Sequence, residues 1–118
     1  MTDKEKAEEY LNRAKNLLSS GGFFSRMMGH KPDAEEAMIM YKKAGTRFKV
    51  AQLWKDAALA YMAAAKIYEN DKNEKYATAE NYAEAGNCFR KESPNDALNA
   101  YQKSIDIYFE MVSQFLKI

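Results

Sequence analysis

An aromatic residue, a usually small residue four positions later and a second aromatic three positions after that recur about every twenty residues. The clear copies are Tyr41–Gly45–Phe48, Tyr61–Ala65–Tyr68, Tyr82–Gly86–Phe89 and Tyr101–Ile105–Tyr108, with a looser copy at Tyr10, Ala14 and Leu17. Positions i, i+4 and i+7 lie on one face of an α-helix, so each copy predicts the buried stripe of one helix. Alternate copies match best, and a unit of about 40 residues with two helices is typical of stacked helical hairpins.

The composition agrees with this helical fold. Hydrophobic residues make up 47% of the 118 residues, with only 5 Gly and 2 Pro. A net charge of +1 gives no general attraction to nucleic acid. The single Cys88 excludes an internal disulfide and is interpreted as a small core residue. The charged N-terminus is unlike a signal peptide, and the longest apolar run, Ala57 to Ala65, is too short to span a membrane, so we expect a cytoplasmic chain.

Turn and capping signals divide the chain into an N-terminal helix and two antiparallel hairpins. Gly and Pro residues mark a loop over 20–32, and Ser93 with Pro94 is the start signal of the last helix. The predicted helices cover about 2–19, 33–52, 53–70, 76–91 and 94–118. The predicted fold is therefore one all-α domain over 1–118, a tetratricopeptide-like solenoid with a right-handed superhelical twist.

The last predicted helix ends in apolar residues without a polar capping helix, which is typical of a stack cut short after about five helices. Such an end should expose its outer side chains and either self-associate or fray. The candidates are Ile105, Phe109, Val112, Leu116 and Ile118.

No residue pattern favours an enzyme. His30, the only histidine, has no carboxylate or cysteine at ligand spacing, and GGFFSRMMG lacks the spacing of a phosphate-binding loop. We therefore expect no catalytic, metal or cofactor site.

The predicted loop carries four large apolar side chains, which is unusual because loops are normally polar. They are Phe23, Phe24, Met27 and Met28, with Arg26 and Lys31 nearby. Two interpretations stand at this point: the side chains fold back over the first helices, or they insert into a membrane interface with help from the cations.

Basic residues concentrate in the segment 42–55, which holds no acidic residue. They are Lys42, Lys43, Arg47, Lys49 and Lys55. Arg90 follows Phe89 as Lys49 follows Phe48, so the first helix of each hairpin carries a cation at one repeated position. This pattern is either an ordinary lysine-rich face or a basic stripe for a partner.

Three segments carry a resemblance to a known family. They are FFSRMMG, then EEAMIMYKKAGTRFKVAQLWKDAALAYMAAAKIY, then AEAGNCFRKESPNDALNAYQKSIDIY. From about residue 7 to 111 the chain resembles the N-terminal part of the soluble NSF attachment proteins (the SNAP family), nearest the alpha/beta type. The most specific features are the FFS loop, the isolated Trp54 at a helix start and AGNCFRKESP before the last helix.

The resemblance implies a peripheral membrane adaptor in intracellular membrane fusion. Members of the family wrap a four-helix SNARE bundle and recruit a hexameric AAA+ ATPase of the NSF type, which pulls the bundle apart. Phe23, Phe24, Met27 and Met28 fall on the membrane-attachment loop. Lys49, Arg90 and Lys91 fall on basic positions that meet the acidic SNARE bundle.

Family members extend well beyond this length, and their C-terminal helices contact the ATPase, so ATPase stimulation by this chain is in doubt.

The sequence also allows two other functions. The runner-up function is a generic tetratricopeptide module that binds one extended peptide in its groove. A weaker third option is an enzyme subunit.

Overall fold

A computed structural model describes residues 1–20 and 32–117 of the chain. Within them the helices are α1 (Asp3–Ser20), α3 (Pro32–Val50), α4 (Trp54–Ile67), α5 (Lys75–Phe89) and α6 (Pro94–Leu116). A short 3₁₀ helix, η1 (Lys72–Glu74), lies in the polar turn before α5. The prediction of an all-α fold with five helices is confirmed for the described residues.

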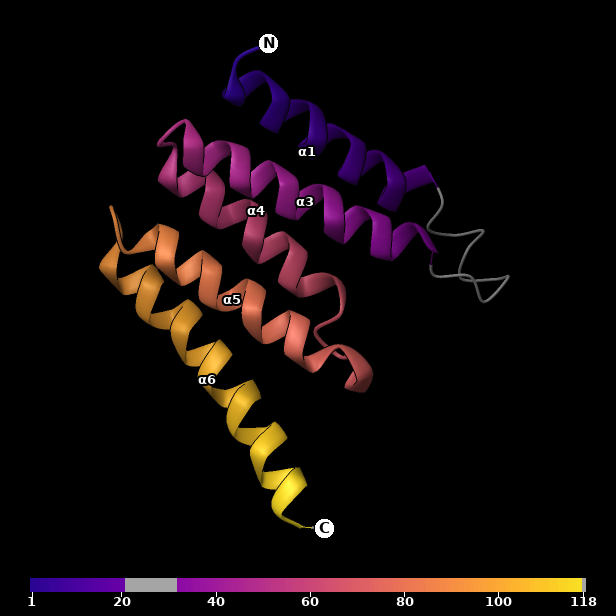
Figure 1. The fold of residues 1–118 in the computed structure, drawn as a ribbon, viewed down its shortest axis with the longest axis vertical. Coiled ribbons are helices and arrows are strands. Elements are labelled where there is room, and N and C mark those ends of the chain that lie inside the picture. The colour runs from indigo at the N-terminus through magenta and orange to yellow at the C-terminus, as the bar shows by residue number, and fades with distance from the viewer. Residues whose placement is uncertain (21–31, 118) are drawn as a thin grey trace.

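The helices form a slab that measures 51 × 41 × 17 Å, about two helices thick. Each α-helix packs against the next one in the chain, from α1 at one end of the slab to α6 at the other (Figure 1). Ion pairs join α3 to α5, and Lys103 of α6 lies near Glu69, just after α4. The helices therefore alternate between two layers, as in a stack of hairpins.

Two glycines explain why the aromatic repeat has a small residue at its centre. A Cβ atom on Gly45 would lie 2.8 Å from the ring of Tyr61, and one on Gly86 would lie 2.7 Å from the ring of Tyr101. In each hairpin, then, a glycine of the first helix makes room for a tyrosine ring of the second helix.

The residue after each glycine binds the hydroxyl group of that same tyrosine. The hydroxyl groups of Thr46 and Tyr61 lie 3.0 Å apart, and the Tyr101 hydroxyl donates to Asn87 Oδ1 at 2.5 Å. This local unit repeats between hairpins, so the 40-residue period of the sequence is also a period of side-chain contacts.

The fourth copy of the repeat is not buried as the periodicity predicts. Ile105 is 57% exposed and Tyr108 is 36% exposed, whereas Tyr41 and Tyr82 are buried. The reason is that no described helix covers the outer side of α6. The separate expectation that Ile105, Phe109, Val112 and Leu116 would be exposed is confirmed, and Ile118 lies outside the described residues.

The helix start signals are met in part. Thr2 and Glu5 form the predicted reciprocal capping box, with the Glu5 N–H donating to Thr2 Oγ1 at 3.2 Å. Helix α3 begins at Pro32, so Asp33 lies inside the first turn instead of before it. Ser93 stands at the N-cap of α6, but its hydroxyl donates to the Asp96 carboxylate at 2.6 Å and accepts no backbone N–H.

The turn between α3 and α4 holds a residue in an unfavourable conformation. Gln52 has φ of 60°, while the Leu53 N–H donates to the Phe48 carbonyl and the Gln52 N–H to the Lys49 carbonyl. These two bonds form a Schellman ending, in which glycine is the usual residue at this position.

We expect Gln52→Gly to raise the free energy of unfolding by about 1 kcal/mol, because glycine adopts positive φ without steric cost. Urea unfolding followed by circular dichroism measures it. Gln52→Ala is the matched control and should give no gain, since alanine removes the side chain but keeps the Cβ. A gain of equal size in both variants would contradict the backbone explanation.

Candidate functional site

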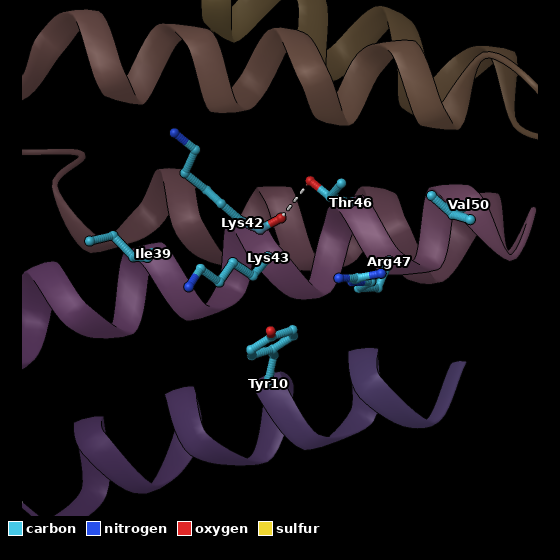
Figure 2. Close-up of a pocket in the computed structure, with 7 residues that line it drawn as sticks. All are labelled: Tyr10, Ile39, Lys42, Lys43, Thr46, Arg47 and Val50. Carbon is cyan, nitrogen blue, oxygen red and sulfur yellow. Dashed lines mark hydrogen bonds between the residues drawn. The ribbon is translucent and has the colours of Figure 1, made fainter. Parts of the chain in front are cut away.

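The exposed side of α3 bears a shallow groove of about 550 Å³ beside α1. Figure 2 shows Tyr10 rising from α1 beneath α3, with apolar side chains at both ends of the groove and cations between them. The lining residues are Tyr10, Ile39, Lys42, Lys43, Thr46, Arg47 and Val50. This groove presents a mixed surface that suits an acidic, partly apolar partner.

The cations of α3 point in two directions. Toward α1, Arg47 Nη1 lies 3.1 Å from Asp3 Oδ1, and Lys43 Nζ lies 5.7 Å from the centre of the Tyr10 ring. Toward α5, Lys42 and Lys49 reach two carboxylates one helical turn apart. The basic residues of α3 thus lie near an aromatic ring and a carboxylate of α1 and near two carboxylates of α5.

Lys49 is one of the residues predicted to bind a SNARE bundle, and it already forms an ion pair within the chain. Its Nζ lies 3.4 Å from Glu84 Oε2 of α5, and its side chain is 39% exposed. Burial is the largest single influence and lowers the pKa of Lys49, but attraction to Glu84, the hydrogen bond to Glu84 and contributions from Tyr61 and Cys88 together raise it. An incoming anion has to share Lys49 with Glu84.

Lys42 makes the second, longer contact of the same kind, with Nζ 4.0 Å from Glu80 Oε1. Glu80 and Glu84 are four positions apart on α5, and so share one face of that helix. Sequence reasoning found the cations but missed these two carboxylates. Their i, i+4 spacing predicts that both carboxylates lie on one face of a helix, but it does not predict that this face lies near α3.

Arg90 and Lys91 lie where α5 ends. Arg90 is the C-cap residue of α5, is exposed, and forms no ion pair within the described residues. Lys91 is exposed as well, with Nζ 5.2 Å from the centre of the Trp54 ring at the start of α4. No hydrogen bond or ion pair links Lys49 to either residue in the described part of the chain. Lys49 lies in the last turn of α3, and Arg90 and Lys91 lie at the end of α5, so both first helices of the hairpins place cations at their C-terminal ends.

The predicted membrane-contacting residues, Phe23, Phe24, Met27 and Met28, lie outside the described residues. Among the helices that the structure describes, none has the length and apolar character needed to cross a membrane. The described ranges also contain no group of three or more potential metal-ligating side chains from His, Cys, Asp or Glu.

Comparison with known proteins gives one consistent result. A family model described as "Soluble NSF attachment protein, SNAP" matches residues 5–115. The chain is 31% identical over 109 residues to the bovine beta-soluble NSF attachment protein, covering 92% of this chain and 36% of that protein. It is 33% identical over 97 residues to the human alpha-soluble NSF attachment protein, covering 82% and 32%.

A plant relative extends this similarity. The alpha-soluble NSF attachment protein of Vitis vinifera is 25% identical over 118 residues, covering 96% of this chain and 38% of the relative. The chain thus spans about a third of the length of the curated relatives it matches. No solved structure matches it significantly.

Proposed function

This chain belongs to the soluble NSF attachment protein family, and from that membership we propose that it is an adaptor, not an enzyme. It would bind an assembled SNARE helix bundle and a membrane surface in the cytoplasm. The NSF-type ATPase that gives the relatives their name would then act on the bound bundle. The 118 residues cover about a third of the relatives' length, so we propose that they supply the SNARE- and membrane-binding part, and that contact with the ATPase belongs to the C-terminal part of the longer relatives.

The observation that carries the proposal is the row of cations along the exposed side of α3 and the end of α5. Lys43 and Arg90 are exposed, and Lys49 keeps part of its side chain accessible. A long acidic helix could meet cations of both hairpins, since Lys43 and Lys49 lie on α3 and Arg90 lies at the end of α5. The nearby Glu80 and Glu84 reduce the field, so we propose short-range pairing with modest electrostatic steering.

The test is a variant with changed charge on this row and unchanged fold. Lys49→Gln, Arg90→Glu and Lys91→Glu are combined, with glutamine at Lys49 because glutamate there would repel Glu84. We expect association with an assembled SNARE bundle to slow about tenfold at low salt and to lose much of its salt dependence. Stopped-flow fluorescence measures the rate, and circular dichroism checks that helicity is unchanged.

The matched control applies the same change of net charge elsewhere. Lys15→Gln, Lys66→Glu and Lys117→Glu alter exposed residues on α1, on α4 and after α6. This variant should slow association less than twofold. Equal slowing by both variants would mean that only net charge matters, and no association by the wild type would contradict the proposed function itself.

A further inference from the structure

Every cation on α3 already interacts with a side chain of a neighbouring helix. Helix α3 carries four cations, of which three form ion pairs and the fourth, Lys43, lies over the Tyr10 ring. In Figure 2 the Lys42 side chain extends away from Tyr10, while Lys43 and Arg47 lie on the Tyr10 side. The three ion pairs join Arg47 to Asp3 of α1, Lys42 to Glu80 of α5 and Lys49 to Glu84 of α5. Four positive charges thus meet three carboxylates, and the excess is one positive charge.

The cations at the end of α5 differ from those on α3. Arg90 is exposed and forms no ion pair within the described residues. Lys91 is exposed and lies over the Trp54 ring, also without an ion pair in the part of the chain that the structure describes. The cations proposed to bind a partner are therefore of two kinds. Arg90 and Lys91 can pair with an incoming anion directly, whereas Lys49 must first leave Glu84.

The two ion pairs between α3 and α5 lie on the surface and can exchange partners. The N–O distance is 4.0 Å for Lys42 with Glu80 and 3.4 Å for Lys49 with Glu84. All four side chains are between 37% and 44% exposed. Ion pairs with this much access to solvent contribute little to stability. Opening them therefore has only a small effect on the fold, and the two carboxylates are free to act in binding.

A partner with negative charge alone gains little from these two lysines. An anion that binds Lys49 displaces Glu84, and the displaced carboxylate remains on α5 beside the new anion and repels it. One ion pair is then exchanged for another, with an added contact between like charges. A partner surface with both signs avoids this repulsion, because its carboxylates can pair with Lys42 and Lys49 while its cations pair with Glu80 and Glu84. Repulsive groups that act against a competitor are a general source of binding specificity.

We propose that Glu80 and Glu84 are specificity-determining residues, which screen Lys42 and Lys49 against simple polyanions and favour a helical partner surface that carries both signs of charge. The inference rests on the proposed function, because it concerns the same face of the chain. It adds the kind of surface that a SNARE bundle has to present there, which an acidic character alone does not specify.

Titration with fluorescently labelled heparin, a sulfated polyanion, tests the screening. Glu80→Gln with Glu84→Gln should bind heparin about tenfold more tightly than the wild type at low salt, because both lysines lose their competitors. Glu8→Gln with Asp106→Asn removes the same charge from exposed positions of α1 and α6 and should strengthen binding less than about twofold. Circular dichroism and urea unfolding check that both variants keep the fold. An equal gain in both variants would overturn the proposal, since net charge alone would then explain it.

Two further measurements test the lysines and the selectivity. With Lys42→Gln and Lys49→Gln added, the gain from the two glutamate substitutions should disappear, and a gain that persists would overturn the proposal. Toward an assembled SNARE bundle, Glu80→Gln with Glu84→Gln should gain less than about threefold, because cations of the bundle lose their partners. A gain as large as that for heparin would mean that the carboxylates do not select between partners, which also overturns the proposal. A wild type that binds no bundle contradicts the proposed function instead, while the heparin titrations still decide the screening.

Discussion

Replacing Phe23 and Phe24 with serine is expected to lower the affinity of the chain for phospholipid vesicles by about 100-fold. Burial of each phenyl group at an interface contributes roughly 1.5–3 kcal/mol at most, and 1.4 kcal/mol is a factor of ten in affinity. Co-sedimentation with vesicles of neutral and acidic lipids measures the loss. The prediction rests on the sequence of the 20–32 segment and on the family resemblance.

Two controls separate membrane contact from a structural role. Val50→Ser with Leu59→Ser removes two apolar residues that are 60% and 52% exposed on α3 and α4, and should leave vesicle binding unchanged. Urea unfolding of the Phe23→Ser, Phe24→Ser variant then measures stability. If this variant binds lipid as well as the wild type but is less stable, the alternative interpretation holds, in which these side chains cover the first helices.

The fold was predictable from the sequence because the residues that specify each helix lie close together in the chain. The aromatic at i, the small residue at i+4 and the aromatic at i+7 specify both a helix and its buried face. The paired glycines also specify where two helices approach closely. Helix ends were less predictable: α4 ends at Ile67, three residues before the expected Asn70, because turn propensity alone does not place the last helical hydrogen bond.

The candidate site was predictable only as a list of cations. The partners of Lys42 and Lys49 are about 35 to 38 positions away in the chain, on α5, and no local pattern pairs two distant helices. For the same reason, periodicity placed Ile105 on a buried stripe, although no described helix covers it and it is 57% exposed. Both gaps concern contacts between elements, which depend on the stacking order and not on residue type.

The close contacts between each hairpin glycine and the tyrosine ring opposite it give the second prediction with a large effect. Gly45→Ala and Gly86→Ala combined should lower the free energy of unfolding by about 3 kcal/mol, because overpacking costs typically 1–3 kcal/mol per site. The helix propensity of alanine offsets up to about 1 kcal/mol of this at each site. The Tyr61 ring has little room to move because it is only 5% exposed, and the hydroxyl groups of both Tyr61 and Tyr101 are hydrogen-bonded. Urea unfolding followed by circular dichroism measures the sum.

A change of sign tests this explanation more sharply than the size of the loss. In a Tyr101→Ala background the ring that would meet the new Cβ is gone, so Gly86→Ala should become neutral or stabilising by up to about 1 kcal/mol. Asn99→Ala, at an exposed position of α6, is the control for helix propensity alone and should be mildly stabilising. If Gly86→Ala stabilises the wild-type chain as much as Asn99→Ala does, the ring does not restrict this position. The repeat would then reflect helix formation without the glycine–tyrosine contact that joins the helices of each hairpin.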